Sequence, residues 1–235
     1  MKHVWENGRC RFCGASQEVY EKDREGLETH AYQFIHTVHP EKIFNMRFDV
    51  IIGNPPYQLS DGGFGISASP IYHKFVKQAK KLNASYVSMI IPARWYAGGK
   101  GLDEFRDTML RDDRLREIHD YPEAFDCFPG VQIKGGICFF LWNRDCRGKC
   151  KVVTHRSNVV TSVMERDLLE RDCDTFIRYN EAISILYKVR ACGERTLSGQ
   201  ISSRKPFGLA TTFRGHKVKD EINDITIYQN GGIGY

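Results

Sequence analysis

An apolar run that stops at a double proline constrains this chain more than any other feature. Residues Phe48–Gly53 are typical of a short, fully buried strand at the centre of a parallel sheet. Asn54, Pro55, Pro56 and Tyr57 follow directly. Two consecutive prolines remove two backbone donors and stiffen the chain. We therefore expect the strand to end here, with an amide, a fixed carbonyl and an aromatic ring at its carboxyl end.

Alternating strand and helix patterns follow this run along the chain. Ser69 and Pro70 are typical of a helix start, with serine as the N-cap and proline at the first helical position. The apolar stripe that follows ends at Asn83, and a second stripe lies within 102–111. Four further strands are predicted, at Ser85–Ile91, Leu115–Tyr121, Gly136–Trp142 and Cys150–His155. The pattern predicts an α/β layered sheet with an antiparallel element at one edge.

The pattern weakens beyond residue 155. Short helices are expected at Glu165–Glu170 and Glu181–Val189, and 198–235 is irregular, basic and glycine-containing. From residue 144 onward there are 16 basic and 11 acidic residues, which accounts for the whole formal net charge of +5. Six basic residues and no acidic residue lie from Arg195 to Lys219. This local excess suits a polyanionic partner, although a solvated surface explains the charge equally well.

The overall composition is that of an ordinary globular protein, with 41% hydrophobic and 27% charged residues. No apolar run approaches the roughly 20 residues that span a membrane. The first ten residues lack the apolar stretch of a signal peptide. We therefore expect a cytoplasmic protein with no membrane partner, in which the eight cysteines do not form a disulfide framework.

Three segments together resemble a known family. FDVIIGNPPYQ, SMIIPARW and FPGVQIKGGICFFLW are similar, in sequence and order, to the N6-adenine DNA methyltransferases of restriction–modification systems with the gamma motif order. The resemblance covers residues 1–155 well and the remainder loosely. It implies transfer of a methyl group from S-adenosyl-L-methionine to N6 of a flipped adenine in double-stranded DNA, with a restriction subunit or domain as a candidate partner.

The resemblance assigns the chemistry of the reaction to the motif. An exocyclic amine is a poor nucleophile because its lone pair is conjugated into the ring. In the family, the asparagine side-chain oxygen and the first proline carbonyl accept hydrogen bonds from the two N–H groups of the amine. These hydrogen bonds free the lone pair. Here these groups belong to Asn54 and Pro55, and Pro56 helps to fix the direction of the carbonyl, so that little reorganisation is needed.

Two aromatic residues are expected to hold the base once it has left the duplex. Tyr57 would stack on it, and Phe128 is expected as a second wall, although Val131 or Ile133 could be the aligned position instead. A plain structural explanation exists for both rings. Asn-Pro-Pro-Tyr could be a turn at a strand end with Tyr57 as core filler, and Phe128 could be an apolar loop anchor.

The donor-binding segments of the family are expected upstream of this chain. In the gamma order a strand, a Gly-rich turn and an acidic residue precede the motif, yet only 47 residues precede Phe48, and none of them fits this pattern. The glycines of Asp61–Gly65 lack a preceding strand and a directly following helix. We therefore expect the C-terminal half of a Rossmann-like methyltransferase sheet plus a partial target-recognition region. This chain alone should bind S-adenosyl-L-methionine poorly.

Cysteine and histidine residues gather near the N-terminus. Cys10 and Cys13 are two residues apart, and His30, His36 and His39 follow. A Cys-x2-Cys pair and a distant histidine pair can complete a tetrahedral zinc site. Cys10, Cys13, His30 and His36 are therefore predicted to bind a zinc ion that stabilises an insertion. A reduced thiol pair with surface histidines explains the same residues equally well.

These observations divide the chain into a Cys/His-rich segment over 1–45, a catalytic methyltransferase subdomain over 46–155 and a partial target-recognition region over 156–235. Contacts with DNA phosphates are expected from the basic residues Arg195, Arg204, Lys205, Arg214, Lys217 and Lys219. Two rival functions stay open. A protein glutamine N5-methyltransferase uses the same motif on a planar amide, but such chains end soon after the sheet. A non-catalytic DNA-binding fragment would lack a donor site.

Overall fold

The computed structural model describes residues 3–18, 30–59, 69–195, 197, 213, 215, 219, 226–229 and 232–234. The chain forms two units, which comprise residues 1–186 and 187–235. The first unit contains the motif and its surroundings. The division into segments 1–45, 46–155 and 156–235 stays a prediction.

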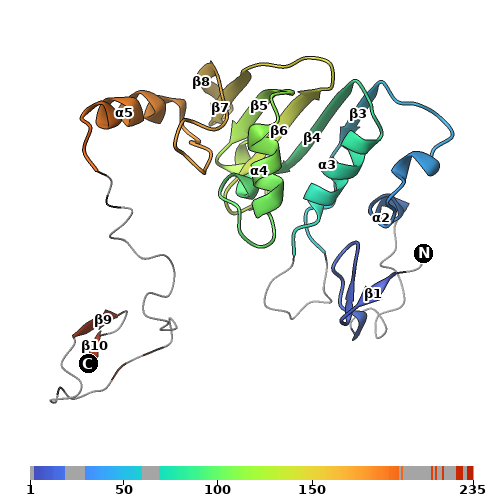
Figure 1. The fold of residues 1–235 in the computed structure, drawn as a ribbon, viewed down its shortest axis with the longest axis horizontal. Helices are drawn as coiled ribbons and strands as arrows, with labels where there is room; N and C mark the ends of the chain where they lie inside the picture. The colour runs from blue at the N-terminus through green and yellow to red at the C-terminus, as the bar shows by residue number, and fades with distance from the viewer. Residues whose placement is uncertain are drawn as a thin grey trace. The chain divides into compact units, whose positions relative to one another are not determined.

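A six-stranded mixed sheet forms the centre of the first unit, in the order β3-β4-β6-β5-β7-β8 (Figure 1). The strands are β3 Val50–Gly53, β4 Tyr86–Pro92, β5 Leu115–Tyr121, β6 Ile137–Asn143, β7 Cys150–Arg156 and β8 Val159–Arg166. β3 is parallel to β4, and β5 is parallel to β7. β6 is antiparallel to both of its neighbours, and β8 is antiparallel to β7. The predicted α/β class is confirmed.

Two details of the predicted elements are wrong. An antiparallel strand, β8, does lie at one edge of the sheet, but the antiparallel strand β6 lies inside the sheet, between β4 and β5. Ile137, Cys138 and Phe140 of β6 are fully buried, and a strand that is apolar on both faces is most stable in the interior. The helix expected at Glu165–Glu170 is absent from this described segment, because β8 continues to Arg166 as the second strand of a hairpin with β7.

The strand before the motif is not the buried central strand that its composition predicts. β3 begins at Val50 and lies at the edge of the sheet, where β4 is its one partner among the described strands. Val50 and Ile52 are 51% and 81% exposed, whereas Ile51 packs against the core. The run is apolar on both faces, but burial depends on neighbouring elements that a local pattern does not specify.

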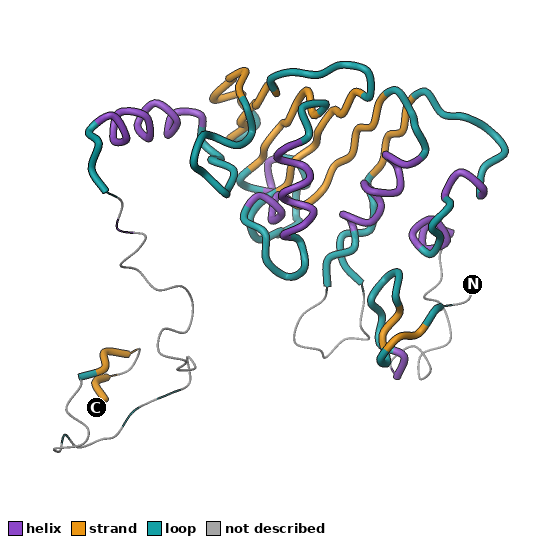
Figure 2. The backbone as a smooth tube through the Cα atoms, viewed as in Figure 1, coloured by secondary structure: helices purple, strands orange, loops and turns teal. Residues whose placement is uncertain are grey.

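Two helices cover one face of the sheet (Figures 1 and 2). They are α3 Tyr72–Lys81 and α4 Asp103–Arg111, which confirms both predicted apolar stripes. Leu102, Phe105 and Met109 are buried, as the second stripe predicts. Asn83 follows the end of α3 with a φ of 58°, a left-handed conformation that asparagine tolerates, and it stops the helix as expected.

The predicted start of the first helix is wrong by two residues. α3 begins at Tyr72, with Ile71 at the N-cap and no side-chain cap. The Ser69 carbonyl accepts a hydrogen bond from Leu59 N at 3.0 Å, and Pro70 forms a β-bridge with Gln58. Residues 69 and 70 therefore pair with the chain that leaves the motif, and this pairing takes the place of an N-terminal helical turn.

The remaining described elements are short, except for α5. They are the hairpin β1 Trp5–Glu6 and β2 Arg9–Cys10, the helices α2 His30–Ile35 and α5 Asn180–Ala191, the 3-10 turns η1 Pro40–Lys42, η2 Ala93–Tyr96 and η3 Ala124–Asp126, and the hairpin β9 Ile227–Gln229 and β10 Gly232–Gly234. α5 confirms the helix predicted at Glu181–Val189. None of the described helices is long and apolar enough to cross a membrane.

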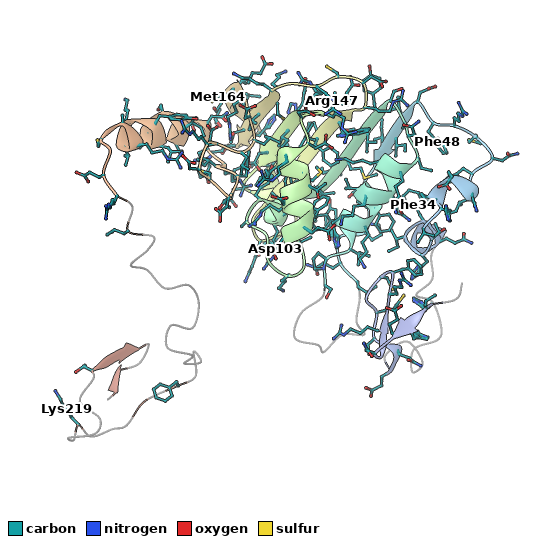
Figure 3. All side chains as sticks on the ribbon, in the orientation of Figure 1. Phe34, Phe48, Asp103, Arg147, Met164 and Lys219 are labelled. Atoms are coloured by element: carbon teal, nitrogen blue, oxygen red, sulfur yellow. The ribbon has the colours of Figure 1, made fainter. Side chains whose placement is uncertain are left out.

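Two hydrophobic cores stabilise the first unit. The main core lies between the sheet and the helices α3 and α4, and its largest fully buried side chains include Trp95, Phe105 and Phe140. Phe34 of α2 contacts both cores (Figure 3). The buried members of the second core are Cys10, Cys13, Ile35, Ile71 and Phe75. The second core therefore joins the N-terminal segment to the beginning of α3.

Candidate active site

The sheet topology brings the motif and two distant loops to one edge. β3 and β4 are parallel, so their carboxyl ends meet at the same edge, and Asn54 and Arg94 follow these two ends. β6 is antiparallel to β4, with Ile137 opposite Pro92, so the loop that precedes β6 reaches the same edge. Ligand sites of α/β sheets lie at such carboxyl ends.

A pocket of about 890 Å³ opens at this edge. Its lining residues are Asn54, Pro55, Pro56, Tyr57, Gln58, Pro70, Tyr72, Pro92, Arg94, Lys100, Phe128, Val131, Gln132, Ile133 and Lys134. The four residues of the motif therefore share one pocket with Phe128. Val131 and Ile133, the alternatives to Phe128, line the same pocket, so the choice of the second aromatic wall stays a prediction. The volume lies within the range of small-molecule sites.

The backbone around the motif is fixed by pairing with the chain just before α3. Ile71 N donates a hydrogen bond to Tyr57 O at 3.1 Å, and Leu59 N donates to Ser69 O at 3.0 Å. Pro55 is buried, whereas Asn54 is exposed. Within the described part of the chain, neither the Asn54 side chain nor the Pro55 carbonyl forms a hydrogen bond. Two acceptors are therefore available at the pocket.

Tyr57 lines the pocket and also packs against the main core. Its hydroxyl is buried without a hydrogen-bond partner among the described residues. Burial, with smaller contributions from Cys127 and Cys138, raises the pKa of Tyr57 to about 12. The phenol therefore stays neutral near pH 7 and does not act as a base, so the ring is what Tyr57 offers to a ligand.

The opposite side of the pocket is a folded loop between β5 and β6. Phe128 N donates to Ala124 O at 2.8 Å, and Val131 N donates to Phe128 O at 3.1 Å. Phe128 is half-buried, and Val131 is 45% exposed. Because the loop is held by its own backbone hydrogen bonds, it presents apolar side chains toward the motif without help from a ligand.

A buried ion pair anchors the end of this loop. Arg178 donates to both carboxylate oxygens of Asp120, at 2.7 and 2.8 Å, and also to the Gly135 carbonyl at 2.8 Å. Gly136 has a φ of 76°, and a Cβ there would lie 2.1 Å from the Tyr121 carbonyl. The loop therefore needs glycine at residue 136, and Arg178 connects it to the segment after β8.

Three cations at the pocket were not predicted from the sequence. Arg94, Lys100 and Lys134 line it, and all three are exposed. A neighbouring cavity of about 410 Å³ shares Arg94 and Lys134. Arg94 and Lys134 lie within the segments SMIIPARW and FPGVQIKGGICFFLW. The sequence could have indicated them, because Arg94 comes just after one apolar strand and Lys134 just before another. No acidic side chain lines the larger pocket.

The residues predicted to contact DNA phosphates are mostly not described. Arg195 and Lys219 are described, and both are exposed. Arg204, Lys205, Arg214 and Lys217 lie outside the described residues. The role of this basic stretch stays a prediction.

The structure brings three of the four predicted metal ligands together. Cys10, Cys13 and His36 form a cluster whose fourth member is His3, a residue that the spacing argument missed. The side chain of His30 lies outside the described residues. His3 could have been noticed as a histidine seven residues before the first cysteine, on the other side of a hairpin.

Comparison with known proteins identifies the family. The model of the Eco57I restriction-modification methylase family matches residues 1–128, which is more than half of the chain. The chain belongs to this family of restriction–modification methylases. It is also similar to an uncharacterized adenine-specific methylase of Mycoplasma pneumoniae, with 39% identity over 155 residues. That match covers 62% of this chain and 37% of the relative, so the chain spans well under half of the relative's length.

Solved structures show weaker likenesses. A type I restriction–modification methyltransferase subunit from Streptococcus thermophilus matches with 13% identity and a TM-score of 0.34, over 65% of this chain and 33% of that one. The type IIG restriction endonuclease BpuSI matches with 19% identity and a TM-score of 0.31, over 55% of this chain and 13% of that one. Likenesses at this level do not bear on function.

Proposed function

We propose that this chain is the acceptor-binding, catalytic part of a DNA methyltransferase that methylates N6 of adenine in a restriction–modification system. The observation that carries the proposal is the pair of acceptors at the pocket. The Asn54 side chain and the Pro55 carbonyl form no hydrogen bond within the described residues, and the Tyr57 ring adjoins them. The name of the Mycoplasma pneumoniae relative favours adenine over the amide of a protein glutamine.

The proposed chemistry uses these groups to activate a planar amine. The exocyclic amine of adenine donates hydrogen bonds from its two N–H groups to the Asn54 side-chain oxygen and the Pro55 carbonyl. These contacts favour a tetrahedral nitrogen, which frees the lone pair for attack, and the amine releases one proton to solvent once the new N–C bond has formed. Because Pro55 is buried and Pro56 stiffens the chain, the carbonyl is already oriented before the substrate arrives. Tyr57 stacks on the adenine, which has left the duplex to reach the pocket.

The target that we propose is an adenine flipped out of double-stranded DNA. Arg94, Lys100 and Lys134 surround the pocket with positive charge and no acidic side chain lines it, which suits the phosphates on either side of a flipped nucleotide. The basic residues from Arg195 to Lys219 are proposed as further contacts with DNA phosphates. A restriction subunit or domain as a partner, and a cytoplasmic location beside the DNA, belong to the same proposal.

S-adenosyl-L-methionine supplies the electrophilic methyl group when it is bound. The described residues do not fit a site for it. Ribose hydroxyls are typically held by an acidic side chain beside a Gly-rich turn, and no acidic residue lines the pocket. β3 is the edge strand and pairs only with β4 among the described strands, so its free edge suits pairing with further strands that carry the donor site. Calorimetric titration of this chain with S-adenosyl-L-methionine should show no micromolar binding; such binding would overturn this placement.

The zinc ion predicted from the N-terminal cysteines and histidines would take no part in methyl transfer. None of the four clustered side chains lines the pocket. Cys10 and Cys13 belong to the second core, so a metal ion there would act on the fold.

Product analysis tests the proposed function and separates it from its rivals. The protein as its gene encodes it is incubated with radiolabelled S-adenosyl-L-methionine and unmethylated genomic DNA, and the DNA is then digested to nucleosides. We expect the label in N6-methyladenine. Label in protein glutamine would favour the N5-methyltransferase, and DNA binding without label in either product would favour the non-catalytic fragment.

A further inference from the structure

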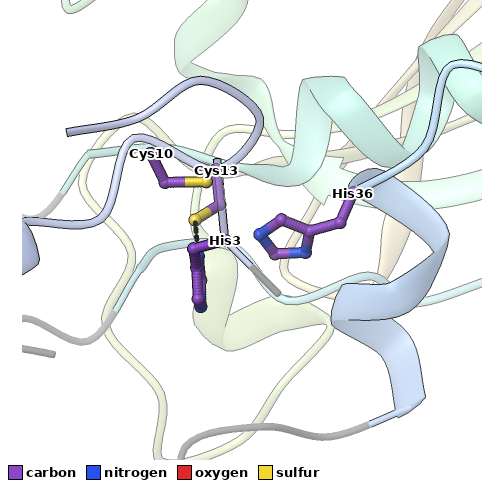
Figure 4. A group of neighbouring side chains, drawn as sticks. All are labelled: His3, Cys10, Cys13 and His36. Carbon is purple, nitrogen blue, oxygen red and sulfur yellow. Dashed lines mark hydrogen bonds between the residues drawn. The ribbon is translucent and has the colours of Figure 1, made fainter. Parts of the chain in front are cut away.

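Four potential metal ligands meet beneath the beginning of α3 (Figure 4). They are His3, Cys10, Cys13 and His36, and their ligand atoms all lie within 4.8 Å of one another. Cys10 and Cys13 are 3% and 2% exposed, and both are free thiols. The four residues come from three separate parts of the N-terminal segment, so their convergence is a property of the fold and not of local sequence.

We propose that these four side chains bind one structural zinc ion, with His3 as the ligand that completes the site. Two sulfur and two nitrogen ligands form a common closed zinc site. The distance from Cys13 Sγ to His3 Nδ1 is 3.6 Å. In a tetrahedron with Zn–S near 2.3 Å and Zn–N near 2.0–2.1 Å, a sulfur and a nitrogen lie about 3.6 Å apart. All four ligand atoms lie within 4.8 Å of one another, which is at most about 1 Å beyond the ligand–ligand separations of such a tetrahedron.

The backbone fixes the two thiols on the same side of a tight turn. Gly14 N donates to Cys10 O at 2.8 Å, and Cys10 N donates to Ala15 O at 2.9 Å, so residues 10–15 fold back on themselves. Gly14 makes this turn possible, since its φ is 82°. The thiols therefore converge because of backbone geometry and do not depend on flexible side chains.

The two histidines are held by ring contacts. His3 stacks on Trp5 with centroids 4.9 Å apart, and it meets His36 edge to face at 4.7 Å. His36 directly follows α2, and its ring also meets Phe12 at 6.0 Å. This packing restricts the rings to the neighbourhood of the thiols.

The site is connected to the loop that carries the motif through the second core. Cys10 and Cys13 share the second core with Ile71, whose backbone N–H donates to Tyr57 O. Lys74 of α3 donates a hydrogen bond to the carbonyl of Phe12, between the two cysteines. A zinc ion at the site would therefore stabilise the beginning of α3, where Ile71 holds the motif loop by its hydrogen bond to Tyr57. This inference does not depend on the nature of the reaction.

Metal analysis of the purified 235-residue chain tests the proposal. We expect one zinc ion per chain. His3→Ala and Cys13→Ser should each weaken zinc binding, measured by competition with a chelator, by more than the 10- to 100-fold typical of changes outside the ligand shell. His39→Ala is the matched control, because His39 is exposed and pairs with Glu41 at 3.0 Å, and it should bind zinc like the wild type. His30→Ala should do the same.

Cobalt substitution gives a readout that does not depend on stability. Co²⁺ bound by the wild type should show thiolate charge-transfer and tetrahedral d–d bands, and the d–d bands should shift in His3→Ala but not in His30→Ala. Removal of zinc should also speed amide exchange at Leu59 and Ile71. Less than stoichiometric zinc, or zinc and cobalt binding by His3→Ala equal to that of the wild type, would overturn the proposed site.

Discussion

Arg178 holds the fully buried carboxylate of Asp120 with two parallel hydrogen bonds, at 2.7 and 2.8 Å. The same guanidinium donates to the Gly135 carbonyl, so the pair connects the end of β5 to the loop that precedes β6. That loop forms the wall of the pocket opposite the motif. A buried pair of this kind is costly to break, because removing one partner leaves the other charge without compensation.

Replacing Arg178 should therefore destabilise the fold and loosen the pocket wall. We expect Arg178→Gln to lower the free energy of unfolding by about 3 kcal/mol, measured by urea denaturation. The matched control is Arg147→Gln, which breaks an exposed pair with Asp113 and should cost less than about 1 kcal/mol. Equal effects of the two substitutions would contradict the anchoring role of Arg178.

Substitutions should separate the contribution of the Tyr57 ring from that of its hydroxyl. The buried hydroxyl has no hydrogen-bond partner in the described part of the chain, so Tyr57→Phe should leave the unfolding free energy unchanged or raise it slightly. Tyr57→Ala should lose base stacking and weaken binding to DNA by about 1–3 kcal/mol. A Tyr57→Phe variant that binds DNA as poorly as Tyr57→Ala would show that the hydroxyl, and not the ring, makes the contact.

The cations around the pocket should contribute to DNA binding through phosphates. Replacing Arg94, Lys100 or Lys134 by alanine should weaken affinity across sequences, and each substitution should reduce the slope of log affinity against log salt by about 1. Lys81→Ala is the control, because Lys81 is exposed at the opposite end of α3. Fluorescence anisotropy over a salt series measures the slope. Slopes that match Lys81→Ala for all three variants would rule out binding of phosphates by these cations.

His73 should make the protein less stable in mild acid. Burial, helped by Lys74 and Lys77, lowers its pKa from 6.5 to about 4. The unfolded chain therefore takes up a proton near pH 6.5, and the folded chain does so only near pH 4. The contribution to stability is full above pH 6.5 and falls until about pH 4, by about 2 kcal/mol after allowance for partial exposure.

A phenylalanine at this position should remove that part of the pH dependence. His73 Nδ1 is buried without a hydrogen-bond partner among the described residues, and its ring lies 5.9 Å from that of Phe105, so His73→Phe should be tolerated. Unfolding free energies measured between pH 7 and pH 4 should fall less steeply in His73→Phe than in the wild type. A wild-type slope in His73→Phe would contradict the assignment to His73.

The sequence predicts the local elements well and their neighbours poorly. Periodicity places β5 at Leu115–Tyr121 with the bounds that the structure has, because alternation and burial act over a few residues. It cannot show that β3 lies at an edge or that β6 inserts between β4 and β5, since these depend on contacts across the sheet.

The residues of the candidate site also differ in how well the sequence predicts them. The motif is readable because its proposed chemistry lies in four consecutive residues, and the structure places all four at one pocket. His3 and Arg94 were missed because each reaches its cluster through the fold: His3 meets His36 from 33 residues away, and Arg94 joins Asn54 through the parallel pairing of β3 and β4.

The most direct test of the account is the rate of methyl transfer to adenine by an Asn54 variant. Asn54→Ala removes one of two acceptors at the pocket, so the protein as its gene encodes it should form N6-methyladenine about 100- to 1000-fold more slowly while DNA affinity stays nearly unchanged. Asn45→Ala, an exposed asparagine outside the pocket, is the control and should keep the wild-type rate. Equal single-turnover rates for Asn54→Ala and Asn45→Ala would contradict the proposed role of the motif.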